Sequence, residues 1–240
     1  MLIYSMSVSV DGFIADREDA FGWSVPGEEQ FRFHTAQVGE LGCCLFGRRL
    51  YETMLPWETD SSMRDNELAV AFADIWCAIP KVVFSRTLDS VQGNARLAEA
   101  SLAEEVAAAL DATDKDVEIG GAGPAAAAIQ LGLVDELRMF RNPIVVGGGT
   151  PFMPPVGECI RMELLETRTF GSRVIYERYR RAQQLRPWVR SCPRSRARAV
   201  DLYSCRTVDH DAQTAHMEAS GCLTRRNIDV TLRSMWERYC

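Results

Sequence analysis

The sequence predicts an α/β protein with a mostly parallel twisted sheet, flanking helices and an antiparallel C-terminal edge, in a three-layer α/β/α architecture. Up to about residue 181, short apolar runs typical of strands alternate with segments of helical spacing. After residue 133 the pattern changes, because three β-rich segments (136–146, 162–170 and 173–180) follow one another without a helical segment between them. Strands joined through helices pair in parallel and strands joined by short turns pair antiparallel, so we expect both kinds of pairing.

The individual elements follow from local signals. Four strands are predicted before residue 133, over 2–10, 43–46, 81–85 and 116–119. Five helices are predicted among them, one with Phe31, Val38 and Leu41 on a single face and others over 48–55, 68–79, 102–110 and 124–132. Pro80 closes the third of these helices, and Ser101 with Glu104 forms a capping box at the start of the fourth.

Composition and charge exclude several classes of protein. The 240 residues are 47% hydrophobic and 25% charged, which is typical of a soluble globular protein, and the apolar runs are far shorter than the roughly 20 residues that span a membrane. The first residues lack a basic region and carry Asp11 within an apolar stretch, so we expect no secretory signal. A cytoplasmic protein whose eight cysteines are thiols is therefore predicted. The net charge of −6 argues against a nucleic-acid partner.

The last sixty residues differ from the rest of the chain. Residues 1–180 carry a net charge of −11, whereas residues 181–240 carry +5 and lose the apolar periodicity. We therefore predict a domain over 1–181 and a weakly structured basic tail of unknown role over 182–240. The conceivable zinc ligands in the tail lack the close pair that defines a zinc site, so no metal is predicted; they are Cys192, Cys205, His210, His216 and Cys222.

Three strand-to-helix junctions share one design. Each has an apolar strand that ends in small or glycine residues, with arginine nearby in two of them, and they span 45–49, 83–87 and 119–124. A helix N-terminus offers free N–H groups to a phosphate, glycine allows close approach, and arginine adds charge-assisted hydrogen bonds. The three junctions together predict a ligand with several phosphates; the alternative is three tight turns with surface arginines.

The third junction also fits the G-x-G-x-x-A pattern of dinucleotide-binding folds over residues 121–126. In those folds the pattern follows the first strand, and an acidic strand end comes about 20 residues later. Here the pattern lies in the middle of the chain and has no such acid, so it does not by itself indicate a Rossmann fold.

Several motifs in order resemble one known family. They are VSVDGFIA (8–15), FGRRLYE (46–52), KVVFSRTL (81–88), the glycine pair 120–121, LVDEL (133–137) and the glycine loop within 143–152. As a set they resemble the dihydrofolate reductase-like reductases and, more narrowly, the stand-alone relatives of the reductase domain of riboflavin biosynthesis. The resemblance implies hydride transfer from NADPH to a small heterocyclic, imine or carbonyl substrate, and a homodimer. The zinc deaminase signature of the bifunctional riboflavin enzyme is absent from the sequence.

The resemblance also implies which residues bind NADPH. Gly47, Arg48 and Arg49 correspond to the adenosine side, Ser85, Arg86 and Thr87 to the 2′-phosphate, Gly120, Gly121, Ala122 and Gly123 to the pyrophosphate, and Ser7 and Ile14 to the nicotinamide. Leu50 departs from the family pattern, because dihydrofolate reductases usually have a threonine there. A cis peptide bond between Gly120 and Gly121 is implied as well.

The substrate side carries fewer signals. Glu28, or its neighbour Glu29, stands where dihydrofolate reductases hold their substrate-binding carboxylate; the alternative is that both simply favour the positive end of a helix dipole. His34, the single histidine before the tail, is predicted on a helix surface, and Trp57, Phe72 and Trp76 are predicted in the core. A non-catalytic nucleotide-binding or dimerising module on the same fold is the alternative to a reductase.

Overall fold

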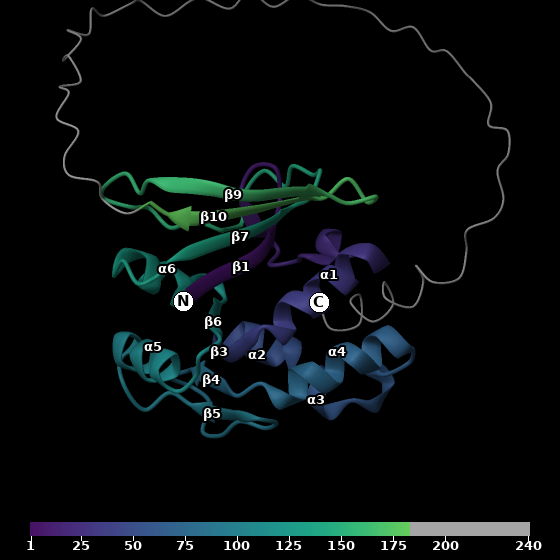
Figure 1. Cartoon of the computed structure of the whole chain (residues 1–240), viewed down its shortest axis with the longest axis vertical. Coiled ribbons are helices and arrows are strands. Elements are labelled where there is room, and N and C mark those ends of the chain that lie inside the picture. The colour runs from purple at the N-terminus through teal and green to yellow at the C-terminus, as the bar shows by residue number, and fades with distance from the viewer. Residues whose placement is uncertain (183–240) are drawn as a thin grey trace, which may run out of the picture. The chain divides into compact units, whose positions relative to one another are not determined.

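One eight-stranded sheet forms the centre of residues 1–182, the part of the chain that this computed structural model describes (Figure 1). Its strands are β1 Leu2–Val8, β3 Leu41–Gly47, β4 Lys81–Phe84, β5 Ala95–Leu97, β6 Asp116–Gly120, β7 Glu136–Arg141, β9 Met162–Thr169 and β10 Ile175–Arg181. They lie in the order β5-β4-β3-β6-β1-β7-β10-β9. In this spatial order, each strand from β5 through β4, β3, β6 and β1 to β7 pairs in parallel with its neighbour. Strand β10 pairs antiparallel with β7 and β9. The predicted mostly parallel sheet with an antiparallel edge is confirmed.

Helices cover both faces of this sheet, so the predicted three-layer architecture is confirmed as well (Figure 1). On one side lie α5 (Leu102–Asp111) and α6 (Ala122–Gln130). On the other side lie α1 (Glu28–Gly39), α3 (Pro56–Thr59) and α4 (Glu67–Ala78), while α2 (Arg48–Met54) starts directly at the end of β3. Two 3-10 turns, η1 (Gly22–Ser24) and η2 (Ser61–Met63), and a small sheet of β2 (Phe13–Ala15) and β8 (Thr150–Pro151) complete the described elements.

The capping signals in the sequence act as expected. The Ser101 hydroxyl accepts a hydrogen bond from the Glu104 N–H, and the Glu104 carboxylate accepts one from the Ser101 N–H at 3.0 Å, so the predicted capping box starts α5. Asn66 caps α4 by accepting a hydrogen bond from the Ala69 N–H at 2.9 Å. These side chains satisfy backbone N–H groups that have no partner inside the helix.

Two boundaries differ from the prediction. Leu41 belongs to β3 and not to the preceding helix, because α1 ends at Gly39 and Leu41 is buried at the start of the strand. The strand predicted over 136–146 ends at Arg141, since Pro143 has no N–H to donate and residues 144–149 form a loop. The short strands β2, β5 and β8 were not predicted, because two or three residues are too few to show a period.

A network of hydrogen bonds ties the loop after β1 to the late glycine loop. The Asp11 carboxylate accepts hydrogen bonds from the N–H groups of Val146 (3.2 Å) and Gly147 (2.8 Å), and Arg17 Nη2 donates to the Gly147 carbonyl at 2.5 Å. Gly147, Gly148 and Gly149 all have positive φ, which only glycine adopts freely. The two loops therefore form one structure next to β1.

Within residues 1–182, the structure contains no helix with the length and apolar character needed to cross a membrane. In the same range it brings together no three metal-ligating side chains in a metal-binding arrangement. The tail predicted for 182–240 lies, except for Ala182, outside the described residues.

Candidate functional site

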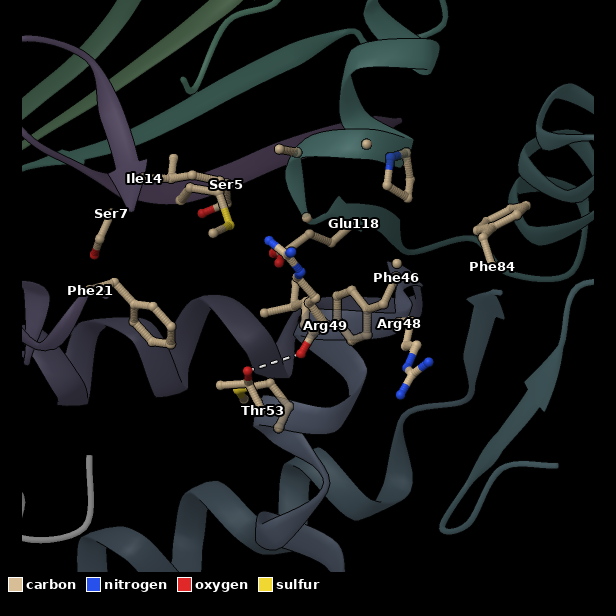
Figure 2. A pocket seen from close by; sticks show the side chains of 18 of the residues that line it. Ser5, Ser7, Ile14, Phe21, Phe46, Arg48, Arg49, Thr53, Phe84 and Glu118 are labelled. Carbon is tan, nitrogen blue, oxygen red and sulfur yellow. Dashed lines mark hydrogen bonds between the residues drawn. The ribbon is translucent and has the colours of Figure 1, made fainter. Parts of the chain in front are cut away.

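A cavity of about 1410 Å³ opens at the carboxyl ends of the parallel strands. Residues of β1, β3, β4 and β6 and of helices α1, α2, α4 and α6 line it. Figure 2 shows it extending from Ser7 and Phe21 on one side to Arg48 and Phe84 on the other. Open α/β sheets bind their ligands at this edge. Because a pocket for one small ligand is typically about 300–1,000 Å³, the cavity has room for a cofactor and a substrate together.

The three strand-end junctions lie side by side along this cavity, because β3 pairs with both β4 and β6. A hydrogen bond joins the first two, from Arg48 Nη1 to Thr87 Oγ1 at 2.8 Å. The first and third also touch: a Cβ on Gly121 would lie 3.6 Å from the Gly47 nitrogen, and a Cβ on Gly47 would lie 3.2 Å from Pro124 Cδ. Three junctions that are far apart in the sequence thus make one continuous surface.

Ten of the twelve residues predicted to bind the cofactor line the cavity. They are Ser7, Ile14, Gly47, Arg48, Arg49, Ser85, Arg86, Gly121, Ala122 and Gly123. The other two lie next to it: Thr87 is bonded to Arg48, and Gly120 is buried beneath Leu50 and Phe46. The geometry brings the whole predicted set together, while the cofactor contacts themselves stay a prediction.

The predicted cis peptide bond between Gly120 and Gly121 is wrong, since no cis bond occurs within residues 1–182. The chain turns through Gly121 instead, whose φ of +82° is readily adopted only by glycine. Gly120 leaves no space for a side chain, because a Cβ there would meet Leu50 Cδ2 and the Phe46 ring. A trans bond with one positive φ is enough to lead β6 into α6.

Three exposed arginines line the junction side of the cavity. Arg48 Nε donates to Glu52 Oε1 at 2.7 Å, and Arg49 pairs with Asp19 at 3.1 Å. Arg86 makes no hydrogen bond or ion pair with any residue in 1–182. The guanidinium group stays charged at physiological pH and binds phosphate through two N–H groups at once. This side of the cavity is therefore suited to a phosphate.

The opposite side is formed by β1 and the first loop. Ser7 lies next to Phe140, its partner on β7, and Ile14 comes from β2. Figure 2 places Ser7, Ile14 and Phe21 together on this side. Ser7 and Ile14 are the positions that the family resemblance assigns to the nicotinamide end, and Phe21 was not predicted there.

The structure does not bring Glu28 to the cavity. Its carboxylate is exposed and accepts a hydrogen bond from Arg32 Nη2 at 2.8 Å. The Glu29 carboxylate accepts hydrogen bonds from Arg168 Nη2 at 2.9 Å and from the Gly171 N–H at 3.0 Å. Both acids act at the start of α1 in the way the helix-dipole alternative describes, and the geometry gives no support to a substrate contact by Glu28.

The expectation that His34 lies on the helix surface is wrong. His34 is half-buried and lines the cavity, with its ring centroid 3.9 Å from that of Phe140. Burial lowers the pKa of His34 to about 4, so the imidazole is neutral near pH 7. Gln30 Nε2, one turn earlier on the buried face of α1, lies 3.5 Å from His34 Nε2. The sequence did not show that this face of α1 packs on β7.

Glu118 is the cavity residue that sequence reasoning missed. It lies on β6 between the fully buried Val117 and Ile119, and its half-buried side chain lines the cavity. Burial raises the pKa of Glu118 to about 7, and the positive charge of Arg138 acts in the opposite direction. The available signal was an acid inside an apolar strand that ends directly at Gly120, at the ligand-binding edge.

Four aromatic side chains form what we call the aromatic wall: Phe31, Trp57, Phe72 and Trp76. Trp57 packs edge to face on Phe72 with centroids 4.6 Å apart, and Phe31 lies 5.3 Å from Phe72. Each is at most 5% exposed. The prediction that Trp57, Phe72 and Trp76 belong to the core is confirmed, and the same residues also line the cavity.

Comparison with known proteins identifies the class to which this fold and cavity belong. The family model described as the RibD C-terminal domain matches residues 1–176, so the chain belongs to the RibD C-terminal domain family. The chain is also 28% identical over 178 residues to the uncharacterized protein YyaP of Bacillus subtilis (strain 168), covering 72% of this chain and 91% of YyaP. The resemblance drawn from the motifs is thereby confirmed.

Solved structures share the same fold. A Shewanella sp. PV-4 protein assigned to riboflavin biosynthesis aligns with a TM-score of 0.61 at 22% identity, over 76% of this chain and 99% of that one. RibD of Acinetobacter baumannii aligns with a TM-score of 0.55 at 16% identity, over 75% of this chain and 57% of that one. A pyrimidine reductase-like protein from Corynebacterium diphtheriae aligns with a TM-score of 0.52 at 13% identity, over 76% and 92% of the two chains.

Proposed function

We propose that this chain is an NADPH-dependent reductase that transfers a hydride to a small heterocyclic, imine or carbonyl substrate. The observation that carries the proposal is the alignment of three phosphate-compatible junctions along one cavity. Membership of the RibD C-terminal domain family, whose solved relatives include reductase-like proteins, supports it.

The residues present fit a dinucleotide with an extra phosphate. Arg86 has no hydrogen-bond or ion-pair partner within residues 1–182, and Arg48 donates to Thr87 at 2.8 Å; both facts support our assignment of these arginines to a 2′-phosphate. Nothing lies within 4 Å of where a Cβ on Gly123 would be, which leaves the start of α6 open to a pyrophosphate. Leu50 has no hydroxyl to donate to a phosphate of the cofactor, so backbone N–H groups donate these hydrogen bonds instead.

NADPH, when bound, supplies the hydride, and the protein therefore needs no nucleophile of its own. Ser7 and Ile14 orient the nicotinamide end at the side of the cavity opposite the arginines (Figure 2). Phe21 and the first loop, held by Asp11 to the glycine loop, cover that end and keep water away from the transferred hydride. Orientation and exclusion of water are the protein's contributions to the reaction.

The cofactor assignment is tested by the dissociation constants of NADPH and NADH for the wild type and for the Arg86→Ala and Arg48→Ala variants. A hydrogen bond to a charged group contributes about 1.5–3 kcal/mol, so each variant is expected to bind NADPH about 10- to 100-fold more weakly. NADH, which lacks the phosphate, is expected to change little. Arg32→Ala, an exposed arginine that does not line the cavity, is the matched control.

Equal affinity of the wild type for NADH and NADPH would refute this assignment, as would equal losses for both cofactors in the variants. Turnover is measured separately, by NADPH consumption with a panel of small heterocycles, imines and carbonyl compounds. Tight NADPH binding with no consumption across the panel favours the non-catalytic nucleotide-binding module.

We also propose that the chain forms a homodimer through the outer edge of β9. This eight-residue strand is the last of the sheet among residues 1–182 and exposes Leu164 (53%) and Leu165 (38%). An edge strand is a template for pairing with another chain. Light scattering of the full chain is expected to give twice the monomer mass, and Leu164→Arg is expected to shift it to the monomer. A wild-type monomer at high concentration would contradict the proposal.

A further inference from the structure

The charged residues that line the cavity are distributed unevenly among its walls. The cations are Arg48 and Arg49 on α2 and Arg86 after β4. The walls formed by α1 and α4 contribute no cationic residue; their lining side chains are Phe31, His34, Gln37, Val38, Phe72 and Trp76. Arg49 is already paired with Asp19 at 3.1 Å. Among residues 1–182, an anionic group on the α1 and α4 side would therefore find no cation on those walls.

That side is lined by aromatic side chains. Within the aromatic wall, Phe31 stacks on Trp57 with centroids 5.9 Å apart, and Phe72 stacks on Trp76 at 5.8 Å. These buried rings hold one another in place, so the wall is rigid. Each ring is at most 5% exposed, so what it presents to the cavity is a small apolar surface, which favours the edge of an aromatic ring over a charged group.

Glu118 supplies a polar group from the sheet. Its side chain extends from β6 toward the space between Ser5 and Arg49 in Figure 2, and it makes no hydrogen bond or ion pair with any residue in 1–182. When protonated it donates a hydrogen bond to a ring nitrogen or carbonyl oxygen, and when ionised it repels an anion. The ionised state therefore disfavours a substrate with a carboxylate or phosphate at this place, whereas the protonated state offers a hydrogen bond to an uncharged ring.

We propose that the substrate is an uncharged, planar ring compound without phosphate or carboxylate groups, which lies along the aromatic wall and meets Glu118 through a polar ring atom. This inference rests on the proposed function, which assigns the arginine-bearing junctions to the cofactor. It separates this chain from a reductase of phosphorylated substrates, because among residues 1–182 the α1 and α4 walls of the cavity contribute no cation for such a substrate to bind.

The protonation of Glu118 makes the inference testable by pH. Burial raises its pKa to about 7. The titratable and charged groups around it are the Cys44 thiol on β3, whose pKa burial also raises, and Arg138 on β7, while Ile3 on β1 adds no charge. Across the cavity lie the cation Arg49 and His34, whose pKa burial lowers to about 4, so that its imidazole is neutral near pH 7. Among the cavity-lining residues of 1–182 with a shifted pKa, Glu118 is the one whose pKa lies near neutral pH.

The probes are quinoxaline, a planar uncharged C=N heterocycle, and quinoxaline-2-carboxylate, its anionic analogue. Their dissociation constants are measured by calorimetry on the full chain, with and without saturating NADP⁺, at about pH 5.5 and about pH 8.5, on either side of the Glu118 pKa. At the lower pH, quinoxaline is expected to bind at least about tenfold more tightly than quinoxaline-2-carboxylate. At the higher pH, where Glu118 is ionised, this preference for quinoxaline over its carboxylate is expected to grow by about another tenfold.

Glu118→Gln separates this effect from general packing. The variant is expected to keep the preference for quinoxaline but to lose its growth with pH, whereas Glu163→Gln, an exposed acid on β9, is expected to behave as the wild type. The wild-type pH profile gives the same answer if the Glu118 variant does not fold. Equal binding of the two probes, tighter binding of the carboxylate, or no quinoxaline binding would overturn the inference.

The cofactor measurement keeps the two proposals apart. Glu118→Gln is expected to bind NADPH within about threefold of the wild type, because Glu118 is not assigned to the cofactor. If NADPH fails to bind the wild type, the proposed function fails; if NADPH binds and the anionic probe binds as tightly as quinoxaline, only the substrate inference fails.

Discussion

The two faces of the central sheet are built differently, and β6 shows the contrast within three residues. Val117 and Ile119 point to one face, where they are fully buried, whereas Glu118 points to the other face and lines the cavity. Strand geometry forces this division, because successive side chains alternate between the two faces of a sheet.

The face toward α5 and α6 is largely apolar. Leu2, Leu45, Val117 and Ile119 are fully buried there and belong to one cluster with the small residues of α6. Alanines such as Ala125 let the helix approach the sheet closely, so this face is filled by packing. It stabilises the fold and holds the strand ends in register.

The face toward α1 and α4 is interrupted. One apolar cluster surrounds Phe72 and another surrounds Phe140, and a charged group centred on Glu136 belongs to neither. Glu136 is fully buried and accepts hydrogen bonds from Arg138 Nε at 2.8 Å and Arg178 Nε at 2.7 Å. Burial alone would raise the pKa of Glu136, but the bonds from these arginines outweigh it and lower the pKa. Glu118, the polar side chain that lines the cavity from the sheet, therefore lies on the face that apolar packing does not fill.

The largest effect is expected from Glu136→Gln. The substitution leaves the buried Arg138 and the partly exposed Arg178 without their shared counter-charge, and removing one partner of a buried ion pair typically costs about 3–5 kcal/mol. Urea denaturation measures the free energy of unfolding, with Glu163→Gln on the exposed strand β9 as the control. A loss below that of a typical surface substitution would show that the charged group does not stabilise this face.

Ile119→Ala tests the packed face. Removing a fully buried isoleucine side chain leaves a cavity among closely packed neighbours and is expected to cost about 2–5 kcal/mol. Ile144→Ala, at a position that is 37% exposed, is expected to cost much less. If both variants lose the same free energy of unfolding, the close packing of the face toward α5 and α6 does not contribute more to stability than the exposed surface does.

Glu118→Gln is expected to stabilise the protein in a pH-dependent way. The folded pKa of about 7 lies above the ordinary value of 4.5, so the wild type loses stability as the pH rises from about 4.5 to about 7 and the glutamine variant does not. After allowance for partial solvent access, the variant gains roughly 2 kcal/mol above pH 7 and almost nothing near pH 4.5. Melting temperatures of both proteins across this range check the expectation; a constant difference would contradict it.

His34→Gln is expected to give the smallest and opposite pH effect. The folded pKa of about 4 lies below the ordinary 6.5, so the stability from the neutral imidazole is complete above about pH 6.5 and is lost as the pH falls toward 4. The wild type is therefore expected to lose roughly 1–2 kcal/mol more than the variant over this range. Melting temperatures of the wild type and the variant across this pH range check the expectation. If the two melting temperatures fall by the same amount, His34 is protonated as easily in the folded as in the unfolded chain.

Local signals in the sequence determined the elements and the chemistry of the junctions. The capping box at Ser101 forms because its partners are three residues apart, and β3 and β6 end at their glycines. The ligand-binding edge could be predicted in the same way, since parallel strands place all their carboxyl ends together. These features depend on neighbours in the sequence or on the sheet type alone.

Only the tertiary structure decided the protonation states of the titratable side chains that line the cavity and the partners of its charged residues. Whether Glu118 is charged depends on how much water reaches it, and His34 is neutral because α1 packs its ring against Phe140. Glu28 is exposed for a similar reason, because the face of α1 that meets the sheet is set by packing and not by the order of residues. Desolvation acts through contacts between segments far apart in the chain, and it is not visible in any local pattern.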